Sequence, residues 1–136
     1  MGRLIIISNR LPFSLDKEGD KVSLRQSSGG LVSAIKSYFE NTAAQRGEIT
    51  EKMWMGVADF PQEDWDHLMA SHLEGQDFSL LPVFVDKELY DNYYNGFSNS
   101  VLWPLFHYFS SLANYENQYF EAYVQVNQLL DRKSVV

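Results

Sequence analysis

The sequence contains no cysteine among its 136 residues, and it has few cationic side chains, with 11 lysines and arginines against 18 aspartates and glutamates. Without cysteine, a disulfide framework, a thiolate zinc site and a cysteine nucleophile are excluded. The formal net charge of −7 argues against nucleic acids and anionic membranes as partners, because both require a basic surface. An anionic ligand must therefore be held by a few local positive groups.

Long apolar runs are also missing, and no segment reaches the length that a bilayer span requires. The apolar run Leu4–Ile7 is as short as a strand and stops at a polar Ser-Asn-Arg segment, unlike a signal peptide. Ile6 stands where an N-myristoylation motif needs serine or threonine. Because 45% of the residues are hydrophobic, we expect a folded protein, and we place it in the cytoplasm.

Several signatures of catalysis are absent as well. The sequence has no G-x-G-x-x-G fingerprint, P-loop or G-x-S-x-G elbow. The acidic side chains between residues 59 and 66 are typical of a solvated helix start, and no carboxylate pair stands out as a glycosidase dyad. His67 and His72 are five positions apart, a spacing that does not stack two ligands on one helix face. We therefore predict no metal site.

What the sequence does contain is an alternation of short apolar runs with amphipathic segments. Leu4–Ile7, Met53–Val57 and Phe78–Val85 are predicted strands. The first run is typical of a strand buried on both faces, and Pro82 places the third near a sheet edge or a bend. Strands that alternate with helices predict an α/β fold with a parallel sheet.

The connecting segments predict helices and one hairpin. A polar turn at residues 16–20 precedes a weakly alternating segment at 21–26, which indicates a small hairpin or a lid. A helix is expected from Gly30, followed by a polar connection over residues 41–52. Further helices are expected after Pro61, from Lys87 to about Asn95 with a break near Gly96, and from Ser100 and Tyr115 onward. The predicted apolar helix faces comprise Leu31, Ala34, Ile35 and Tyr38, then Trp65, Leu68 and Met69, and finally Tyr119, Tyr123, Val126 and Leu130.

Two positions could bind an anion. Arg10 follows the first predicted strand, and ligands of open α/β sheets bind at the carboxyl ends of strands. Its guanidinium can hold a phosphate through two hydrogen bonds. Gly29 and Gly30 precede a helix whose backbone N–H groups and dipole favour an anion. On position alone, a surface ion pair and an ordinary glycine turn are the commoner explanations.

The densest feature is the aromatic stretch DNYYNGFSNSVLWPLFHY at residues 91–108. Rings with polar tips can stack on a sugar while their O–H and N–H groups fix its orientation. Tyr94 and Trp103 are candidates for this role, and Trp54 fits either a core ring or a site residue. The remaining side chains are expected to support the structure: Phe97, Phe106 and Tyr108 as core rings, and Asn95, Asn99 and His107 as polar groups behind the site or satisfied in the interior.

Four segments, in this order, resemble the trehalose-6-phosphate synthases: SNRLP at 8–12, SSGGLVSAI at 27–35, YYNGFSN…LWPLFHY at 93–108 and YVQVNQLL at 123–130. These enzymes are retaining glucosyltransferases that join UDP-glucose to glucose 6-phosphate. Their GT-B architecture has two Rossmann-like domains that face a cleft. The resemblance implies that this chain is an incomplete N-terminal, acceptor-binding domain of that kind.

The resemblance also implies roles for single residues. Arg10 would contact the phosphate of glucose 6-phosphate, and Tyr94 would bind the acceptor. Trp103 would shape the acceptor pocket and its selectivity for one anomer. Gly29-Gly30 would face the UDP-glucose donor, and Trp54 matches a further tryptophan of the family. No cofactor or essential metal is implied, because UDP-glucose is a co-substrate, and the parent enzyme can be oligomeric.

The rest of the family's machinery is not in this chain. It includes an aspartate and a histidine near the acceptor and the donor-binding groups of the second domain. Since catalysis needs groups aimed at the charge of the transition state, we assign no catalytic residue and expect the chain alone to be inactive. The alternative is a non-catalytic phosphosugar-binding or regulatory module.

The end of the sequence carries a separate prediction. Residues 131–136, DRKSVV, are expected to break the helical pattern without a cap, and they match the translation of a common sequencing adapter. We therefore expect residues 1–130 to be part of the acceptor-binding domain and the last six to be a non-native tail. A sheet that lacks strands would leave an open edge and uncovered apolar surface, so marginal stability is expected.

Overall fold

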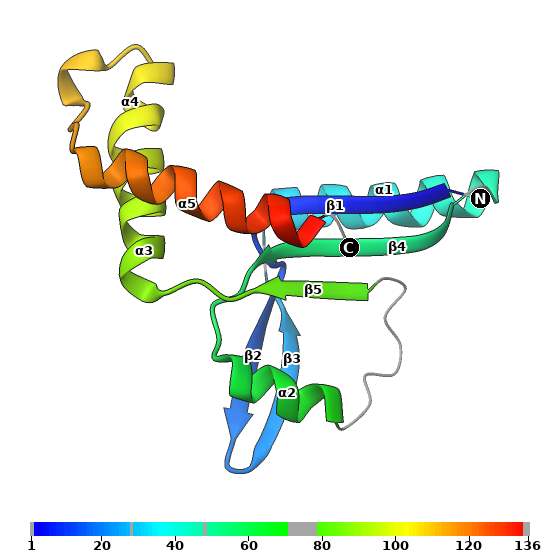
Figure 1. Ribbon diagram of the computed structural model, residues 1–136. Helices are drawn as coiled ribbons and strands as arrows, with labels where there is room; N and C mark the ends of the chain where they lie inside the picture. Colours follow the sequence, from blue (N-terminus) through cyan, green and yellow to red (C-terminus); the bar gives the residue numbers. More distant parts are fainter. Residues whose placement is uncertain (1, 28, 48, 71–78, 135–136) are drawn as a thin grey trace. The chain divides into compact units, whose positions relative to one another are not determined.

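The computed structural model describes residues 2–27, 29–47, 49–70 and 79–134, which fall into two compact units, residues 1–84 and 85–136 (Figure 1). The first unit contains a three-stranded parallel sheet in the order β1-β4-β5. Its strands are β1 (Gly2–Arg10), β4 (Ile49–Val57) and β5 (Ser79–Val83). The predicted α/β fold with a parallel sheet is confirmed.

The prediction that Leu4–Ile7 is buried on both faces is wrong. Residues 4–6 are only half-buried, and the side chain of Ile7 is 49% exposed. The reason is topological, because β1 is an edge strand of this sheet while β4 pairs on both sides. The central strand β4 carries the fully buried Trp54 and Met55.

The other two strands agree with the prediction in kind and differ in extent. β4 begins at Ile49, four residues before the predicted start, so the predicted polar connection is wrong over this part. β5 is an edge strand, as Pro82 indicated, and Pro82 is paired with Gly56 of β4. Phe78, the predicted first residue of this strand, lies outside the described residues.

The predicted hairpin is confirmed. β2 (Phe13–Glu18) and β3 (Lys21–Gln26) pair in antiparallel fashion, with Glu18 opposite Lys21. The turn is shorter than predicted, because residues 16–18 already belong to β2. Gly19 has a φ of +64°, in the left-handed region that favours glycine in tight hairpin turns.

Two helices complete the first unit. α1 (Gly30–Arg46) starts as predicted but continues past residue 41 and ends at the left-handed Gly47. Its predicted apolar face is not buried, since Leu31 and Tyr38 are both exposed. α2 (Gln62–Ala70) does bury its predicted stripe in part: Trp65 and Leu68 pack with Leu11 and Phe60, while Met69 is exposed. Met69 directly follows Leu68 in the helix, and neighbouring helical positions do not share a face, so its side chain lies outside the buried face.

The second unit is helical. It comprises α3 (Lys87–Asp91), η1 (Asn92–Leu102), α4 (Trp103–Phe106), the short 3₁₀ turn η2 (Ser110–Leu112) and α5 (Asn117–Ser134). Asp86 caps α3, because its carboxylate accepts hydrogen bonds from the N–H groups of Glu88 and Leu89. The predicted break near Gly96 is wrong. The helix runs through Gly96, which lies inside the π-helix that begins at Asn92.

The packing of α5 against η1 explains why Gly96 does not break the helix. A Cβ on Gly96 would lie 2.5 Å from Cδ1 of Tyr119, so the missing side chain lets the ring of α5 approach the backbone. The predicted stripe of α5 is confirmed for Val126 and Leu130, which are buried, and Val101 of η1 is buried in the same unit. Glycine at position 96 therefore allows α5 to pack closely against η1.

The last residues of α5 correct one further prediction. The helix continues to Ser134, whose Oγ donates a hydrogen bond to the carbonyl oxygen of Asp131 at 2.7 Å. The prediction that the helical pattern is broken from residue 131 is therefore wrong for residues 131–134. Among the helices of the described residues, none has both the length and the apolar character that crossing a membrane requires.

Candidate functional site

Arg10 is the last residue of β1, at the carboxyl end of the parallel sheet, as predicted. Ile7 lies opposite Met55 and Arg10 opposite Val57, so β1 contains one more residue than β4 between these two pairs. An extra residue of this kind is a bulge, which bends the strand and redirects the side chains that follow. The Arg10 side chain is exposed at this point.

Two hydrogen bonds connect the bulge to the core of the sheet. Nε1 of Trp54 donates to Oγ of Ser8 at 2.9 Å, and Oγ of Ser8 donates to the carbonyl oxygen of Arg10 at 2.6 Å. Trp54 is only 1% exposed, so its ring is a core ring of β4 in this unit. Of the two interpretations of Trp54, the structure favours the core ring, which acts on the Arg10 segment through Ser8.

The backbone after Arg10 runs unusually close to β4. A Cβ on Gly56 would lie 2.5 Å from N of Leu11 and 2.7 Å from C of Arg10. The N–H of Leu11 donates to the carbonyl oxygen of Val57 at 2.9 Å. Glycine at position 56 is therefore needed for this approach, and the sequence MWMGV gave no reason to single it out.

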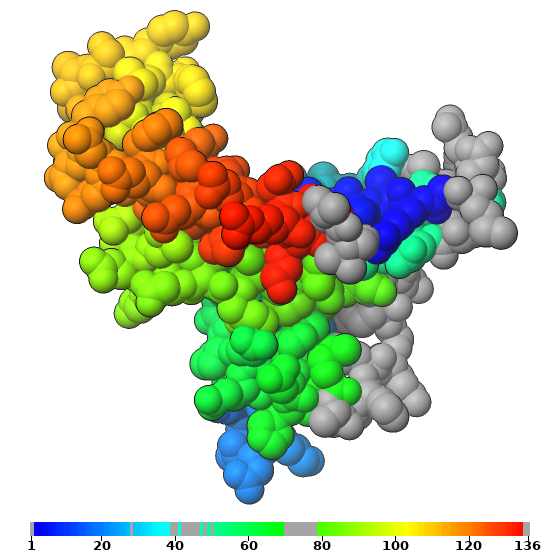
Figure 2. All heavy atoms as spheres, viewed as in Figure 1, coloured from blue at the N-terminus to red at the C-terminus, as the bar shows by residue number. Residues whose placement is uncertain are grey.

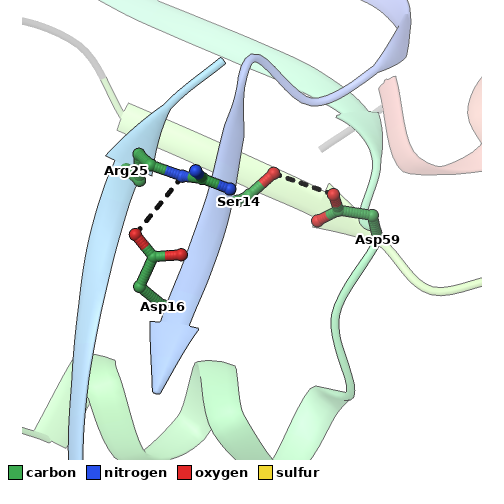
Figure 3. A network of polar contacts seen from close by, with 4 residues as sticks. All are labelled: Ser14, Asp16, Arg25 and Asp59. Carbon is green, nitrogen blue, oxygen red and sulfur yellow. Dashed lines mark hydrogen bonds and ion pairs between the residues drawn. The ribbon is translucent and has the colours of Figure 1, made fainter. Parts of the chain in front are cut away.

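The hairpin is joined to the segment that follows β4 (Figure 3). Oγ of Ser14 in β2 donates to Oδ2 of Asp59 at 2.8 Å, and Nε of Arg25 in β3 lies 3.3 Å from Oδ2 of Asp16. Asp59 was expected only to begin a solvated helix. Arg25 and Asp16 are exposed, and an exposed ion pair of this kind contributes little stability.

The glycine pair lies at the start of α1, as predicted, and Ser28 before it is outside the described residues. Gly29 has an extended backbone, with a φ of 167°, and no side chain caps the helix. A Cβ on Gly29 or Gly30 would meet no atom within 4 Å, so neither strain nor packing in the described residues requires glycine there. The first turn of α1 contains no acidic residue, which leaves its N–H groups suited to an anion.

Tyr94 and Trp103 both lie in the second unit. Tyr94 is near the start of η1, and Trp103 is the first residue of α4. The ring of Tyr94 is half-buried and stacks on Tyr90 with centroids 5.6 Å apart and an interplanar angle of 13°. Trp103 is 62% exposed, and His107 covers one side of its ring at a centroid distance of 3.8 Å. Nδ1 of His107 lies 2.8 Å from the carbonyl oxygen of Trp103.

The π-helix changes how these two positions relate. In an α-helix of about 3.6 residues per turn, positions nine apart lie on opposite sides. A π-helix closes i to i+5 hydrogen bonds, so each of its turns holds more residues than an α-helical turn. The backbone N–H of Trp103 donates to the carbonyl oxygen of Ser98, five residues earlier, as expected for such a wide turn. The wide turn brings the positions of Tyr94 and Trp103 closer to one side of the helix than an α-helix would, although the sequence predicted a break between them.

Several supporting predictions in the aromatic stretch need correction. Phe97 is a core ring as predicted, 4.7 Å from the ring of Tyr123. Phe106 and Tyr108 are not, with exposed fractions of 74% and 97%. The chain leaves the helix after Phe106, and Tyr108 adopts a left-handed φ of 64°. Of the two alternatives for Asn95, Asn99 and His107, the interior position is wrong, because all three side chains are exposed.

Figure 2 shows this part of the second unit, in yellow and orange, as open surface on the face that is viewed. The exposed large rings and aliphatic side chains between residues 103 and 120 are Trp103, Phe106, Tyr108, Phe109, Leu112, Tyr115 and Phe120. Within the described ranges, no three histidine, aspartate or glutamate side chains come together in a way that could hold a metal ion. His72 lies outside those ranges.

Comparison with known sequences gives a consistent result. The sequence model of glycosyltransferase family 20 matches residues 2–135. A UDP-forming alpha,alpha-trehalose-phosphate synthase of Yarrowia lipolytica is 40% identical over 136 residues, which are 98% of this chain and 27% of the relative. Synthase A of Dictyostelium discoideum is 39% identical over 93% of this chain and 16% of its own length. The chain thus spans well under a third of these relatives.

A solved structure shows the same likeness in three dimensions. It is a UDP-forming alpha,alpha-trehalose-phosphate synthase of Burkholderia xenovorans in complex with glucose 6-phosphate. It is 30% identical to this chain and superposes with a TM-score of 0.60, over 98% of this chain and 25% of that structure. The fold predicted from the sequence is thereby confirmed.

Proposed function

The chain belongs to glycosyltransferase family 20, and on that basis we propose that it is the acceptor-binding part of a UDP-forming trehalose-phosphate synthase with a GT-B architecture. The parent protein transfers glucose from UDP-glucose to glucose 6-phosphate, giving trehalose 6-phosphate and UDP. The observation that carries the proposal is the placement of Arg10 at the carboxyl end of β1, on a bulge tied to the buried Trp54.

Arg10 holds the phosphate of glucose 6-phosphate in this proposal. A guanidinium presents its donors in a planar fork that matches two phosphate oxygens. The chain as a whole repels anions, with a net charge of −7, so the attraction must be local. An exposed arginine on a rigid strand end satisfies both requirements.

Tyr94 and Trp103 contact the sugar of the acceptor. The hydroxyl of Tyr94 can orient it, and the exposed ring of Trp103 can pack on it and discriminate between anomers. Gly29 and Gly30 bring the open N–H groups of α1 toward the phosphates of UDP-glucose. Trp54 acts from the core, through Ser8. These groups bind and orient, and we assign no catalytic residue in the chain.

The activity is tested with the protein encoded by the complete reading frame around these residues. Release of UDP should require both UDP-glucose and glucose 6-phosphate. Arg10→Ala should raise KM for glucose 6-phosphate by about 10- to 100-fold, because a charged hydrogen-bonded pair is worth about 1.5–3 kcal/mol. KM for UDP-glucose should be unchanged. The matched control is Arg3→Ala on the same strand, where Arg3 pairs with Glu51 at 3.3 Å.

A protein that releases no UDP under these conditions overturns the synthase proposal. Calorimetry then separates it from the alternative, a non-catalytic phosphosugar-binding or regulatory module. Binding of glucose 6-phosphate that Arg10→Ala abolishes would support the module, and a folded protein without binding would exclude it.

The remaining expectations accompany this proposal and each has a direct test. Activity should persist in a metal chelator, since no metal or cofactor is proposed.

A tagged protein should be found in the cytoplasm by fluorescence microscopy. Sedimentation should reveal whether the parent is oligomeric, and electrophoretic mobility shifts should detect no nucleic-acid binding.

A further inference from the structure

The hydrogen bonds at the end of β1 involve Ser8, a residue for which the sequence analysis predicts no role. The Ser8 hydroxyl accepts from Nε1 of Trp54 at 2.9 Å and donates to the carbonyl oxygen of Arg10 at 2.6 Å. A hydroxyl has one donor and two acceptor sites, so it can make both bonds at once. Each partner fixes the direction of its own bond, because the indole N–H can only donate and a backbone carbonyl oxygen can only accept.

This connection joins a rigid group to a bent segment. The Trp54 ring is buried in the central strand and cannot move without disturbing the core. The Arg10 segment has left the regular β1-β4 register, since β1 contains the extra residue of the bulge there. On its other side the same segment is held by the hydrogen bond from Leu11 N–H to Val57 O. Ser8 thus ties the bulge to the core from one side and Leu11 ties it from the other.

We propose that Ser8 is a positioning residue for Arg10, and that Trp54 acts through it: the Trp54–Ser8–Arg10 hydrogen bonds hold the bulge in the one conformation that aims the guanidinium at the phosphate of the acceptor. The inference rests on the proposed function, because it assigns the task of Arg10. It adds Ser8 as a residue that acts on the phosphate through Arg10, and Ser8 is not a catalytic residue.

The size of the effect follows from how binding depends on geometry. A bidentate arginine–phosphate pair needs both N–H groups aligned, and a displacement of about 1 Å can cost up to about a hundredfold. Without the Ser8 hydroxyl the bulge keeps the Leu11 bond and therefore rotates only partly. We expect Ser8→Ala to raise KM for glucose 6-phosphate about tenfold while KM for UDP-glucose stays unchanged.

Three variants separate this role from a general loss of structure. Ser8→Thr retains the hydroxyl and should restore KM to within about threefold of wild type. Trp54→Phe retains a buried ring but removes the N–H donor, and should raise KM for glucose 6-phosphate as Ser8→Ala does. Ser14→Ala is the matched control, because Ser14 also donates a side-chain hydrogen bond in this unit, to Asp59. It should leave both KM values unchanged.

A spectroscopic readout tests the hydrogen bond without turnover. The protein contains three tryptophans within this chain, Trp54, Trp65 and Trp103, so their indole N–H signals can be assigned from single Trp→Phe variants in ¹⁵N-labelled protein. In Ser8→Ala the Trp54 indole proton should shift upfield, and the other two should not move. Ser8→Thr should keep the wild-type position.

The outcomes distinguish this inference from the function on which it rests. If the wild-type protein neither releases UDP nor binds glucose 6-phosphate, the proposed function fails and the inference falls with it. If wild type is active and Ser8→Ala has an unchanged KM for glucose 6-phosphate, only the inference is overturned. If Ser8→Ala does not fold, Trp54→Phe decides, and a wild-type KM in that variant overturns the inference as well.

Discussion

Gly96 of η1 and the ring of Tyr119 in α5 lie so close that a Cβ on the glycine would be 2.5 Å from Cδ1 and 2.7 Å from Cγ of the tyrosine. Both atoms are near the Tyr119 backbone, so the ring cannot turn aside by moving its far end. The contact joins the wide helix to the last helix, and it explains why a residue that weakens helices stands in the middle of one.

The first prediction concerns this contact. Gly96→Ala should destabilise the protein by about 1–3 kcal/mol, because the added methyl group forces either α5 or η1 to shift. Chemical denaturation followed by circular dichroism measures the change. Gly30→Ala is the control, since a Cβ there meets no atom within 4 Å and alanine favours the helix. Equal stability of Gly96→Ala and wild type would contradict the packing described for Gly96.

The second prediction is a pH dependence that originates at Tyr93. Burial raises the pKa of its hydroxyl above the ordinary value of 10.0, and the neighbouring Tyr90, Tyr123 and Tyr94 raise it further. As the pH rises past about 10, the unfolded chain loses this proton before the folded one does, so stability falls with pH. The stability that the raised pKa of Tyr93 contributes is fully present below pH 10. It is lost as the pH rises through the pKa of Tyr93 in the folded protein.

Thermal melts between pH 8 and pH 11 test this dependence. Tyr93→Phe removes the titrating group and should flatten the decline in Tm at the alkaline end. Phe97→Leu is the matched control, because it alters a buried ring of the same helix without a proton to lose. It should lower Tm at every pH and keep the wild-type slope. A Tyr93→Phe profile as steep as that of wild type would assign the alkaline loss to other groups.

The sequence predicted the first unit well because its signals are local. Pro82, the apolar run at Met53–Val57 and the polar turn at residues 16–20 each restrict the backbone by themselves, and the strands and the hairpin formed at these places, although β4 starts earlier and the turn is shorter than predicted. Burial was predicted less well, as Ile7 and Met69 show. Whether an apolar side chain is covered depends on which elements lie beside it, and periodicity does not contain that information.

Arg10 was singled out by its place after a strand and assigned to the site by the family resemblance, and Tyr94 and Trp103 were chosen by the aromatic composition together with the same resemblance. Ser8 and Gly56 were missed, because their roles come from contacts with residues almost fifty positions away or from a close backbone approach. The π-helix was missed for a related reason. Gly96 weakens an isolated helix, and only the ring of Tyr119 makes its presence there favourable.

The third prediction concerns Trp103. Its ring is 62% exposed, so Trp103→Ala should change stability by less than about 1 kcal/mol, yet it should raise KM for glucose 6-phosphate about tenfold through the loss of ring packing on the sugar. Phe106→Ala is the control, since that ring is more exposed still and is not assigned to the site. Steady-state kinetics and thermal melts give both quantities. Equal KM values for the two variants would remove Trp103 from the acceptor site.

The fourth prediction uses Gly56 to separate stability from acceptor binding. A Cβ at this position would lie 2.5 Å from N of Leu11 and 2.9 Å from the carbonyl oxygen of Arg10, and these backbone atoms can yield only if the whole segment moves. Gly56→Ala should therefore cost about 1–3 kcal/mol of stability and displace Arg10 at the same time.

Val57→Ala is the comparison that makes this prediction decisive. Its side chain is buried in the same strand, so truncation should cost a similar amount, about 1–3 kcal/mol, through the cavity it leaves. Its backbone carbonyl, which accepts from Leu11, is unchanged. Gly56→Ala should raise KM for glucose 6-phosphate by tenfold or more, as expected for an arginine displaced by about 1 Å, whereas Val57→Ala should not. If both variants lose stability and neither changes KM, the conformation of the Arg10 segment does not control acceptor binding.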